Sequence, residues 1–325
     1  MAKMTMVQAL NLALQQEMAS DDSIIVLGQD VGLDGGVFRV TDGLVDRFGA
    51  DRVVDTPLAE AGIVGMSVGM AVYGLKPVCE IQFSGFSYQN FHQIENHAAR
   101  LRWRTRGRLT VPMVLRTPYG GGVRALEHHS ESREAYWAHT PGLKMVIPSG
   151  PRNARALLVS AIRDPDPVIF YESKALYRAY REEVPEEKET LPLGVPQIAR
   201  QGDDVTIIAY GAMLRPALGA ADLLKQEGLQ AEVIDLLTIS PLDATLLIDS
   251  VKKTGRAVVV HEAPRSFGPG AEIAARLMEG AFYFLQAPIE RVTGYDIVIP
   301  FFSREKDYIP NIERIAKACK KVLQA

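Results

Sequence analysis

Residues 53–81, VVDTPLAEAGIVGMSVGMAVYGLKPVCEI, indicate most directly how this chain folds. Val53-Val54 and residues 77–81 are short apolar runs with β-branched residues, which are typical of strands. Residues 57–73 between them are apolar, rich in glycine and alanine, and long enough for a helix. The stretch therefore predicts a strand–helix–strand unit, the building block of a parallel sheet.

The same alternation of strands and helices continues along the whole chain. In the first half we expect further strands at 24–27, 111–115, 145–147 and 168–171, and further helices at 4–19, 87–102 and 151–163. A polar, proline-bearing stretch at 181–204 interrupts the pattern. Beyond it we expect strands at 205–210, 231–236, 257–261 and 289–293, and helices at 214–228, 242–252, 270–280 and 312–323.

This pattern predicts an α/β protein of two domains, each a mostly parallel sheet flanked by helices. We place the first domain at 1–185, a linker at 186–203 and a smaller second domain at 204–325.

Composition limits the possible partners. The chain has 325 residues, 47% hydrophobic and 23% charged, with a net charge of -3, so no basic field attracts nucleic acid or anionic lipid. The two cysteines fit a reducing compartment. No apolar run reaches the ~20 residues that span a bilayer. We expect a cytoplasmic protein that binds neither nucleic acid nor a membrane.

Glu60 is the first candidate for chemistry, because it is a lone acid in the apolar stretch between Asp55 and Glu80. Burial among Ala, Gly, Ile and Val should raise its pKa and so make it a candidate general acid or base. Alternatively, Thr56-Pro57 starts a helix and Glu60 is an acid in its first turn. This segment alone leaves both interpretations open.

Gly62, Gly65 and Gly69 recur at spacings of three and four, so they share one helix face. Each glycine costs a helix about 1 kcal/mol relative to alanine. Such a stripe favours close packing against another backbone, either of this chain or of a second subunit.

Two polar segments are further candidates. His128 and His129 follow a glycine-rich loop. A histidine can move protons near neutral pH, and adjacent histidines in an extended stretch point to opposite sides. They could equally lie on a solvated loop. Asp164 and Asp166 follow a predicted helix, where they could help to bind a hard cation or simply end the helix.

Common phosphate and metal motifs are missing. The sequence contains no G-x-x-x-x-G-K-[ST], G-x-G-x-x-G, H-E-x-x-H or C-x-x-C motif. Neither domain therefore has a recognisable phosphate cradle of its own.

Several segments together resemble one family, and they do so in that family's order and spacing. They are Asp55-Thr-Pro-Leu-Ala-Glu-Ala-Gly-Ile, Glu80-Ile-Gln-Phe, His129-Ser130, Pro141-Gly-Leu-Lys-Met-Val-Ile-Pro and Asp164-x-Asp-Pro-Val-Ile-Phe. The chain resembles the β subunit of the E1 component of 2-oxo acid dehydrogenase complexes, which use thiamine diphosphate. The likeness covers nearly all of the chain. It implies a pyrimidine-binding thiamine-enzyme domain followed by a transketolase C-terminal-like domain.

The resemblance assigns roles to four residues of a cofactor pocket. Glu60 would contact ring nitrogen N1′ of the aminopyrimidine and share a proton with it. Leu58, Gln82 and Phe86 would line the same pocket. His129 matches a histidine at the mouth of the active site that manages protons when the acyl group passes to the lipoyl group of the E2 component.

The resemblance also implies a structural potassium site made largely of backbone oxygens. Its ligands are expected from Met113, Ala161, Ile162, Asp164 and Asp166. Asp166 stands where the family commonly has asparagine, a change that a backbone carbonyl ligand would survive.

The missing phosphate cradle fits a half-site. In thiamine enzymes the diphosphate and Mg²⁺ are held by a Gly-Asp-Gly motif followed about thirty residues later by Asn, and this sequence lacks that motif. The resemblance implies that an α subunit supplies it within an α2β2 heterotetramer. The second domain would form the β–β contact and dock the subunit-binding domain of E2.

The run Ile81-Gln-Phe-Ser-Gly-Phe resembles that of bacterial pyruvate enzymes, so the resemblance favours pyruvate as the substrate over branched-chain 2-oxo acids or acetoin. Two other classes of function stay open. One is a non-catalytic α/β binding subunit, which the joint presence of Glu60, Gln82 and His129 disfavours. The other is a coenzyme A transferase-like β subunit with a glutamate nucleophile.

Overall fold

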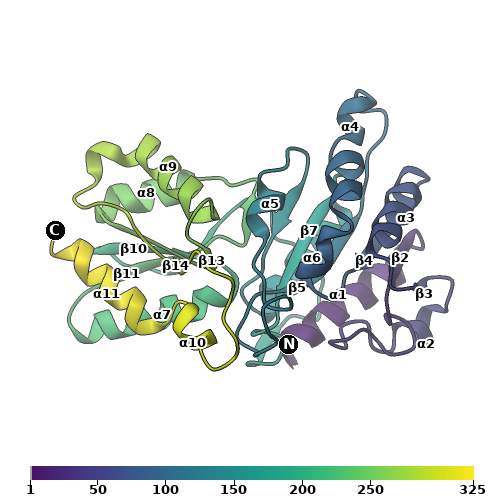
Figure 1. The fold of residues 1–325 in the computed structure, drawn as a ribbon, viewed down its shortest axis with the longest axis horizontal. Coiled ribbons are helices and arrows are strands. Elements are labelled where there is room, and N and C mark those ends of the chain that lie inside the picture. The colour runs from purple at the N-terminus through teal and green to yellow at the C-terminus, as the bar shows by residue number, and fades with distance from the viewer. Residues whose placement is uncertain (1) are drawn as a thin grey trace. The chain divides into compact units, whose positions relative to one another are not determined.

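The computed structural model describes residues 2–325, which form two compact units. The first unit contains the chain up to residue 119 together with 136–193, and the second contains 120–135 together with 194–325. Each is an α/β unit, which confirms the predicted fold class (Figure 1). Residues 120–135 pack with the second unit, although the sequence places them within the first domain.

The core of the first unit is a parallel sheet whose strands are ordered β6-β7-β5-β4-β2-β3. Their bounds are β2 Ile24–Gly28, β3 Val53–Asp55, β4 Lys76–Glu80, β5 Val114–Tyr119, β6 Lys144–Val146 and β7 Val168–Ser173. Every residue of β2, β5 and β7 is buried, as expected for strands covered on both faces. A short antiparallel pair, β1 (Ala2–Met4) and β8 (Glu182–Val184), lies apart from this sheet.

The first part of the described chain contains three long helices that contact the first sheet, together with shorter ones. They are α1 Met6–Ser20, α2 Leu44–Phe48, α3 Glu60–Val72, α4 Leu101–Arg104, α5 Glu134–Ala138 and α6 Pro151–Arg163. α1 packs against α6, and α3 packs against β4 and the helical turns at Gln93–Ala98. Thr5 begins α1 with a capping box, in which its hydroxyl accepts from Gln8 N and its own N–H donates to Gln8 Oε1.

Two of the predicted boundaries are wrong. α3 begins at Glu60 rather than at residue 57, because the chain stays extended through Thr56, whose N–H donates to Gly28 O at 2.9 Å. β5 begins at Val114 rather than at 111, because Pro112 has no N–H to donate to a sheet.

The helix expected at 87–102 is broken into three pieces. A 3₁₀ helix spans Ser84–Tyr88, a π-helical stretch spans Gln93–Ala98, and α4 follows. The π-helical stretch contains the wide bond from Ala99 N–H to Ile94 O at 2.9 Å. Hydrophobic periodicity carries no signal of such a bond.

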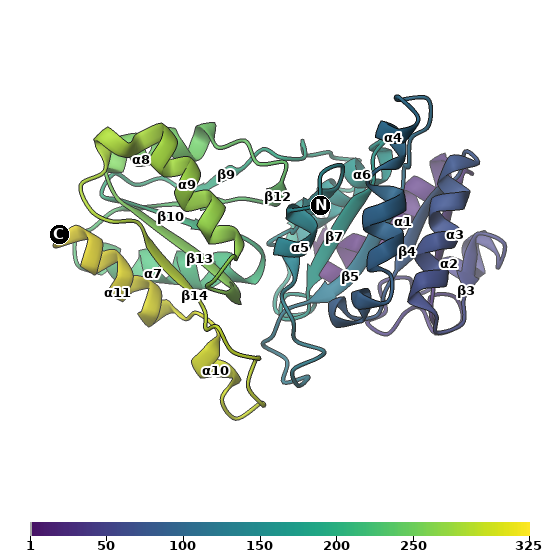
Figure 2. The ribbon, with the colours of Figure 1, turned by 45° about the horizontal axis from the view of Figure 1, so that its top comes forward.

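The second unit is built on a smaller sheet with strand order β14-β13-β10-β11-β9, in which only β9 is antiparallel (Figure 2). Its strands are β9 Gln197–Arg200, β10 Val205–Ala209, β11 Ala231–Asp235, β13 Ala257–Pro264 and β14 Glu290–Gly294. A further short strand is β12 (Thr238–Ser240). Its helices are α7 Leu214–Gln226, α8 Thr245–Thr254, α9 Pro269–Ala281, α10 Glu305–Tyr308 and α11 Ile312–Leu323.

The main strands and helices predicted for the second domain are confirmed, and the expected helix at 312–323 matches α11 residue for residue. No helix within residues 2–325 is long and apolar enough to cross a membrane.

Candidate functional site

Glu60 is the first residue of α3, and its side chain is buried, with the residue only 5% exposed. Its Oε2 atom is buried and has no hydrogen-bond partner anywhere in residues 2–325. Both interpretations of the sequence therefore meet in one residue, since Glu60 lies in the first helical turn and is also buried. A buried polar atom without a partner is unfavourable by about 1–3 kcal/mol, so this oxygen is suited to a group from outside the chain.

The other predicted pocket residues lie at the same edge of the sheet. Leu58 and Glu60 follow β3, whereas Gln82 and Phe86 follow β4. β3 and β4 run parallel on either side of β2, so all four residues lie beyond the carboxyl ends of these strands. Open α/β sheets bind ligands at this edge.

These residues differ in how firmly they are held. The Gln82 amide donates to Asp30 Oδ2 at 3.0 Å. Phe86 is half-buried, and its ring lies edge-on to Phe83 with centroids 5.5 Å apart. Leu58 is 64% exposed, so within this chain it presents an apolar surface to solvent.

A buried ionic cluster lies directly beside this edge. Arg116 donates to both oxygens of Glu172, at 2.7 and 2.8 Å, and to Glu80 Oε2 at 2.7 Å. The Tyr177 hydroxyl also donates to Glu172, at 2.7 Å. Burial raises the pKa of Glu80, while Arg116 opposes this and Glu172 adds to it. The cluster fixes the end of β4, two residues before Gln82.

Asp30 and the Arg116 cluster were missed by the sequence analysis. The signal for Asp30 was its position just after the apolar strand that ends at Gly28, where parallel strands place functional side chains. For the cluster, charged residues inside three otherwise apolar strand runs were the available signal. Only the strand order reveals that β4, β5 and β7 are neighbours.

His128 and His129 lie in the second unit, on the loop between β5 and α5. His128 is exposed and His129 is half-buried, and their rings are perpendicular with centroids 6.0 Å apart. The two side chains thus occupy different environments, as expected for adjacent residues. The four residues of the predicted pyrimidine pocket all belong to the first unit.

Four of the predicted potassium ligands lie in the last turn of α6 or directly after it, and Met113 O accepts a hydrogen bond from Val168 N–H nearby. Both carboxylates already have cationic partners there, since Lys144 Nζ lies 2.7 Å from Asp164 Oδ1 and Arg102 pairs with Asp166. Residues 2–325 contain no group of three or more His, Cys, Asp or Glu side chains suited to a metal. Any cation at this turn would therefore depend on main-chain oxygens.

Main-chain oxygens are present at this turn. Ala161 and Ile162 are among the last residues of α6, where carbonyls lack helical partners. Ala161 O accepts one long bond from Asp164 N–H at 3.3 Å, and Met113 O accepts one from Val168 N–H at 3.0 Å. Each carbonyl retains a second lone pair, so the donor set fits a hard, weakly held cation.

The glycine stripe of α3 is only partly explained by packing within the chain. A Cβ built on Gly65 would lie 3.3 Å from Gln93, but a Cβ on Gly69 would meet nothing within 4 Å. Gly62 and Gly69 are exposed, as are Met66 and Tyr73 on the same helix face. Most of the stripe therefore faces away from the first unit's own residues.

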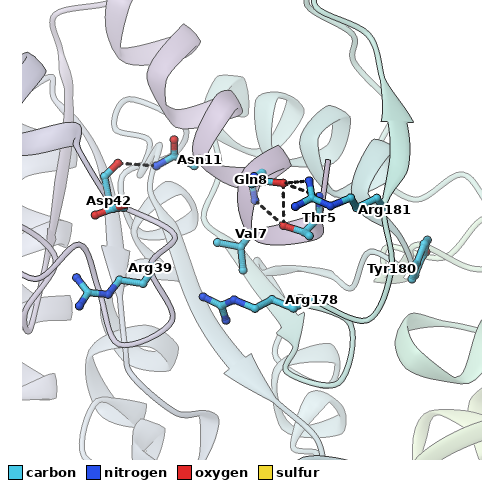
Figure 3. Close-up of a pocket in the computed structure, with 9 residues that line it drawn as sticks. All are labelled: Thr5, Val7, Gln8, Asn11, Arg39, Asp42, Arg178, Tyr180 and Arg181. Carbon is cyan, nitrogen blue, oxygen red and sulfur yellow. Dashed lines mark hydrogen bonds between the residues drawn. The ribbon is translucent and has the colours of Figure 1, made fainter. Parts of the chain in front are cut away.

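A separate pocket of about 700 Å³ lies in the first unit at the start of α1 (Figure 3). Arg39, Arg178 and Arg181 line it, and each donates to neutral oxygens: Arg178 to Phe38 O at 2.9 Å and Arg181 to Gln8 Oε1 at 2.8 Å. Arg39 donates to Asp34 O. None of the residues predicted from the sequence lines this pocket.

Two α/β units, with a buried glutamate at the carboxyl edge of the first sheet, fit the transketolase class of thiamine enzymes. Family models agree: residues 2–179 match "Transketolase, pyrimidine binding domain" and residues 194–315 match "Transketolase, C-terminal domain". Among solved structures, an inactive β4 tetramer of a split-gene transketolase has a TM-score of 0.81 and covers 99% of each chain at 22% identity. A Pichia stipitis transketolase mutant has a TM-score of 0.72 at 14% identity, covering 100% of this chain and 46% of that one. At these identities both structures support the fold alone.

Proteins related in sequence identify the family more narrowly. The chain is 49% identical to the pyruvate dehydrogenase E1 component subunit beta of Acholeplasma laidlawii, covering 100% of this chain and 99% of that one. It is 48% identical to the protein of the same name from Bacillus subtilis, covering 100% of each. The chain belongs to the family of pyruvate dehydrogenase E1 component β subunits, which confirms the resemblance seen in the sequence.

Proposed function

We propose that this chain is the β subunit of an E1 enzyme that oxidatively decarboxylates pyruvate with thiamine diphosphate and passes the acyl group to lipoyl groups of E2. The observation that carries this proposal is the buried Glu60 carboxyl, whose Oε2 has no partner among the described residues. A ring nitrogen of the aminopyrimidine would supply the missing partner.

The residues of the first unit fit one half of the cofactor. Glu60 would hold a proton against N1′, and burial would keep water from competing for that proton. Leu58 and Phe86 would contact the ring through apolar surface, while Gln82 is oriented by Asp30 at 3.0 Å. Thiamine diphosphate itself supplies the carbon nucleophile and the electron sink for decarboxylation.

His129 is proposed to manage protons when the acyl group moves to the lipoyl sulfur. Histidine is the only residue type among the proposed site residues that ordinarily exchanges protons near neutral pH, which suits His129 to accept and return a proton. His128, which is exposed, has no assigned role.

We propose an α subunit as the source of the Mg²⁺ and diphosphate site, in an α2β2 heterotetramer. The missing Gly-Asp-Gly motif and the exposed glycine face of α3 support this assembly. The second unit would provide the β–β contact and the docking site for the subunit-binding domain of E2. Such an enzyme would act in the cytoplasm.

We propose a structural potassium ion at the turn after α6, held by main-chain oxygens of Met113, Ala161, Ile162, Asp164 and Asp166. The ion-paired aspartate side chains support a backbone rather than a carboxylate site.

Replacing Glu60 with Gln in the assembled enzyme tests the catalytic proposal. The amide keeps the shape but cannot exchange a proton, so cofactor-dependent decarboxylation should fall by about 10²–10⁴-fold. Native mass spectrometry should show unchanged assembly. Full activity in the variant would favour the non-catalytic binding subunit, and covalent labelling by an acyl-CoA would favour the transferase-like alternative.

His129→Ala should reduce transfer to a lipoyl domain much more than decarboxylation measured with an artificial electron acceptor. Equal losses in the two assays would contradict the role in acyl transfer. Comparing kcat/KM for pyruvate, branched-chain 2-oxo acids and acetoin on the same preparation would identify the substrate, and we expect pyruvate to be preferred.

A further inference from the structure

The loop that carries His129 is tied to the rest of the second unit by two carboxylates. Glu262, on β13, accepts from Gly121 N–H at 3.0 Å and from the Ser132 hydroxyl at 2.9 Å. Glu305, the first residue of α10, accepts from Gly122 N–H at 2.7 Å and from Arg124 N–H at 3.0 Å. These four bonds connect both ends of the loop to segments more than 100 residues away in sequence.

Burial strengthens these contacts. Glu262 is 5% exposed and Glu305 is 4% exposed. Hydrogen bonds to a carboxylate are shorter and stronger than neutral ones, and water competes little for a buried acceptor. The loop N–H groups therefore satisfy two carboxylates whose burial would otherwise be unfavourable.

The glycines of the loop permit this close approach. Gly120 has φ +79°, a conformation that favours glycine, and a Cβ there would collide with Glu262 Oε1. A Cβ on Gly121 would lie 2.9 Å from Glu305 Oε1 and from the terminal carbons of Ile299 and Ile309. The close approach of Glu262 thus explains Gly120, and that of Glu305, Ile299 and Ile309 explains Gly121.

The histidines occupy the turn that these contacts enclose. Gly120 N–H donates to Glu131 O at 3.0 Å, which closes the loop at its base. Ser130 N–H donates to Glu127 O at 3.1 Å, forming a turn that includes His128 and His129. Three residues after Glu131, Glu134 accepts a hydrogen bond at 2.7 Å from the hydroxyl of buried Tyr210. His129 therefore lies within the same closed loop as Gly122 and Arg124.

We propose that Glu305 and Glu262 are positioning residues that hold His129 in place for acyl transfer. The proposal rests on the role of His129 given above. Glu305 bonds the backbone and neither histidine, so its effect would be indirect. Misplacing a catalytic group by about 1 Å can lower a rate about 100-fold.

Glu305→Gln is the test variant, because each carboxylate oxygen accepts one backbone N–H. The amide replaces one acceptor with a donor, so either Gly122 or Arg124 would face an N–H group. Asp307→Asn is the matched control, since it changes the same charge on the same short helix, where Asp307 pairs only with exposed Arg304 among the described residues.

The first measurement is hydrogen–deuterium exchange on the assembled enzyme. Peptides covering residues 120–126 should exchange about tenfold faster in Glu305→Gln and at the wild-type rate in Asp307→Asn. Unchanged exchange in Glu305→Gln would overturn the proposal, because the loop would then be held by other contacts.

The second measurement is a double-mutant cycle on acyl transfer to a lipoyl domain. Glu305→Gln alone should reduce the transfer about 10–100-fold while sparing decarboxylation with an artificial acceptor. In the His129→Ala background it should have little further effect, because the group that it positions is gone. Fully multiplicative losses would indicate a general structural role and overturn the proposal.

The two measurements separate failure of this inference from failure of the proposed function. If Glu305→Gln frees the loop but neither it nor His129→Ala affects acyl transfer, the role of His129 is wrong. If His129→Ala abolishes transfer while Glu305→Gln frees the loop without effect, only the positioning role is wrong.

Discussion

At the scale of single residues, this chain places several acids where water cannot reach them. Glu60 and Glu134 each bury one oxygen that has no partner within residues 2–325, and Glu80 and Glu172 share the single cation of Arg116. Such groups lower stability unless a ligand, a proton or a neighbouring charge compensates them. For Glu60 we propose a cofactor, whereas for Glu134 burial favours a bound proton.

Glu134 predicts a pH dependence of stability. Burial is the main reason why its pKa rises from 4.5 to about 7, although the Tyr210 hydrogen bond opposes the rise. Between these values the folded chain keeps a proton that the unfolded chain releases, so stability falls as pH rises through this window and levels off above about 7. The total effect is on the order of 3 kcal/mol.

Glu134→Gln removes this titration. The thermal unfolding midpoint of the variant minus that of wild type should therefore be higher at pH 8 than at pH 5. The exposed-acid variant Asp307→Asn should keep the wild-type pH slope. A midpoint difference between Glu134→Gln and wild type that is the same at both pH values would show that Glu134 does not titrate in this range.

At the scale of elements, local pattern determined what could be predicted from the sequence. Long periodic segments such as α6 and α11, and apolar strand runs such as β10 and β13, were predicted because each buries a continuous face. The broken helix at 84–104 and the short strands β1, β8, β9 and β12 were missed, because their geometry depends on contacts distant in sequence.

The candidate site divides in the same way. Glu60 could be identified from the sequence because it is a lone acid in an apolar helix. The carboxylates of Glu262 and Glu305 were not, because nothing local connects them to a glycine loop more than 100 residues earlier.

Two glycine-to-alanine changes test this picture of the glycine loop. Gly121→Ala should destabilise the chain by about 1–3 kcal/mol, because its methyl group would crowd Glu305, Ile299 and Ile309 at 2.9 Å. Gly69→Ala should stabilise the unassembled chain by up to about 1 kcal/mol, because a helical alanine there meets nothing within 4 Å. Chemical denaturation of both variants measures the two effects, and equal changes would argue against the loop contacts.

At the scale of the whole molecule, the chain combines two transketolase-type domains, and we propose that its residues form only part of the cofactor site. The buried acids, the loop glycines and the core apolar side chains are explained by contacts within the two units. The exposed face of α3 is not explained in this way: Gly62, Met66, Gly69 and Tyr73 recur at helical spacing and are solvent-exposed. An apolar, glycine-bearing helix face beside Glu60 is suited to close packing by another subunit.

Gly69→Arg tests whether this face binds the proposed α subunit. A long charged side chain would extend into open space in the free chain, so the variant should fold with a thermal midpoint within a few degrees of wild type. It should nevertheless fail to form the α2β2 particle in native mass spectrometry, because an interface packed on glycine leaves no volume for arginine. Gly69→Ala is the matched control, and it should assemble less strongly than wild type but more strongly than Gly69→Arg. Normal assembly of Gly69→Arg would place the partner on another surface, and Glu60 would then need a different source for the rest of its cofactor site.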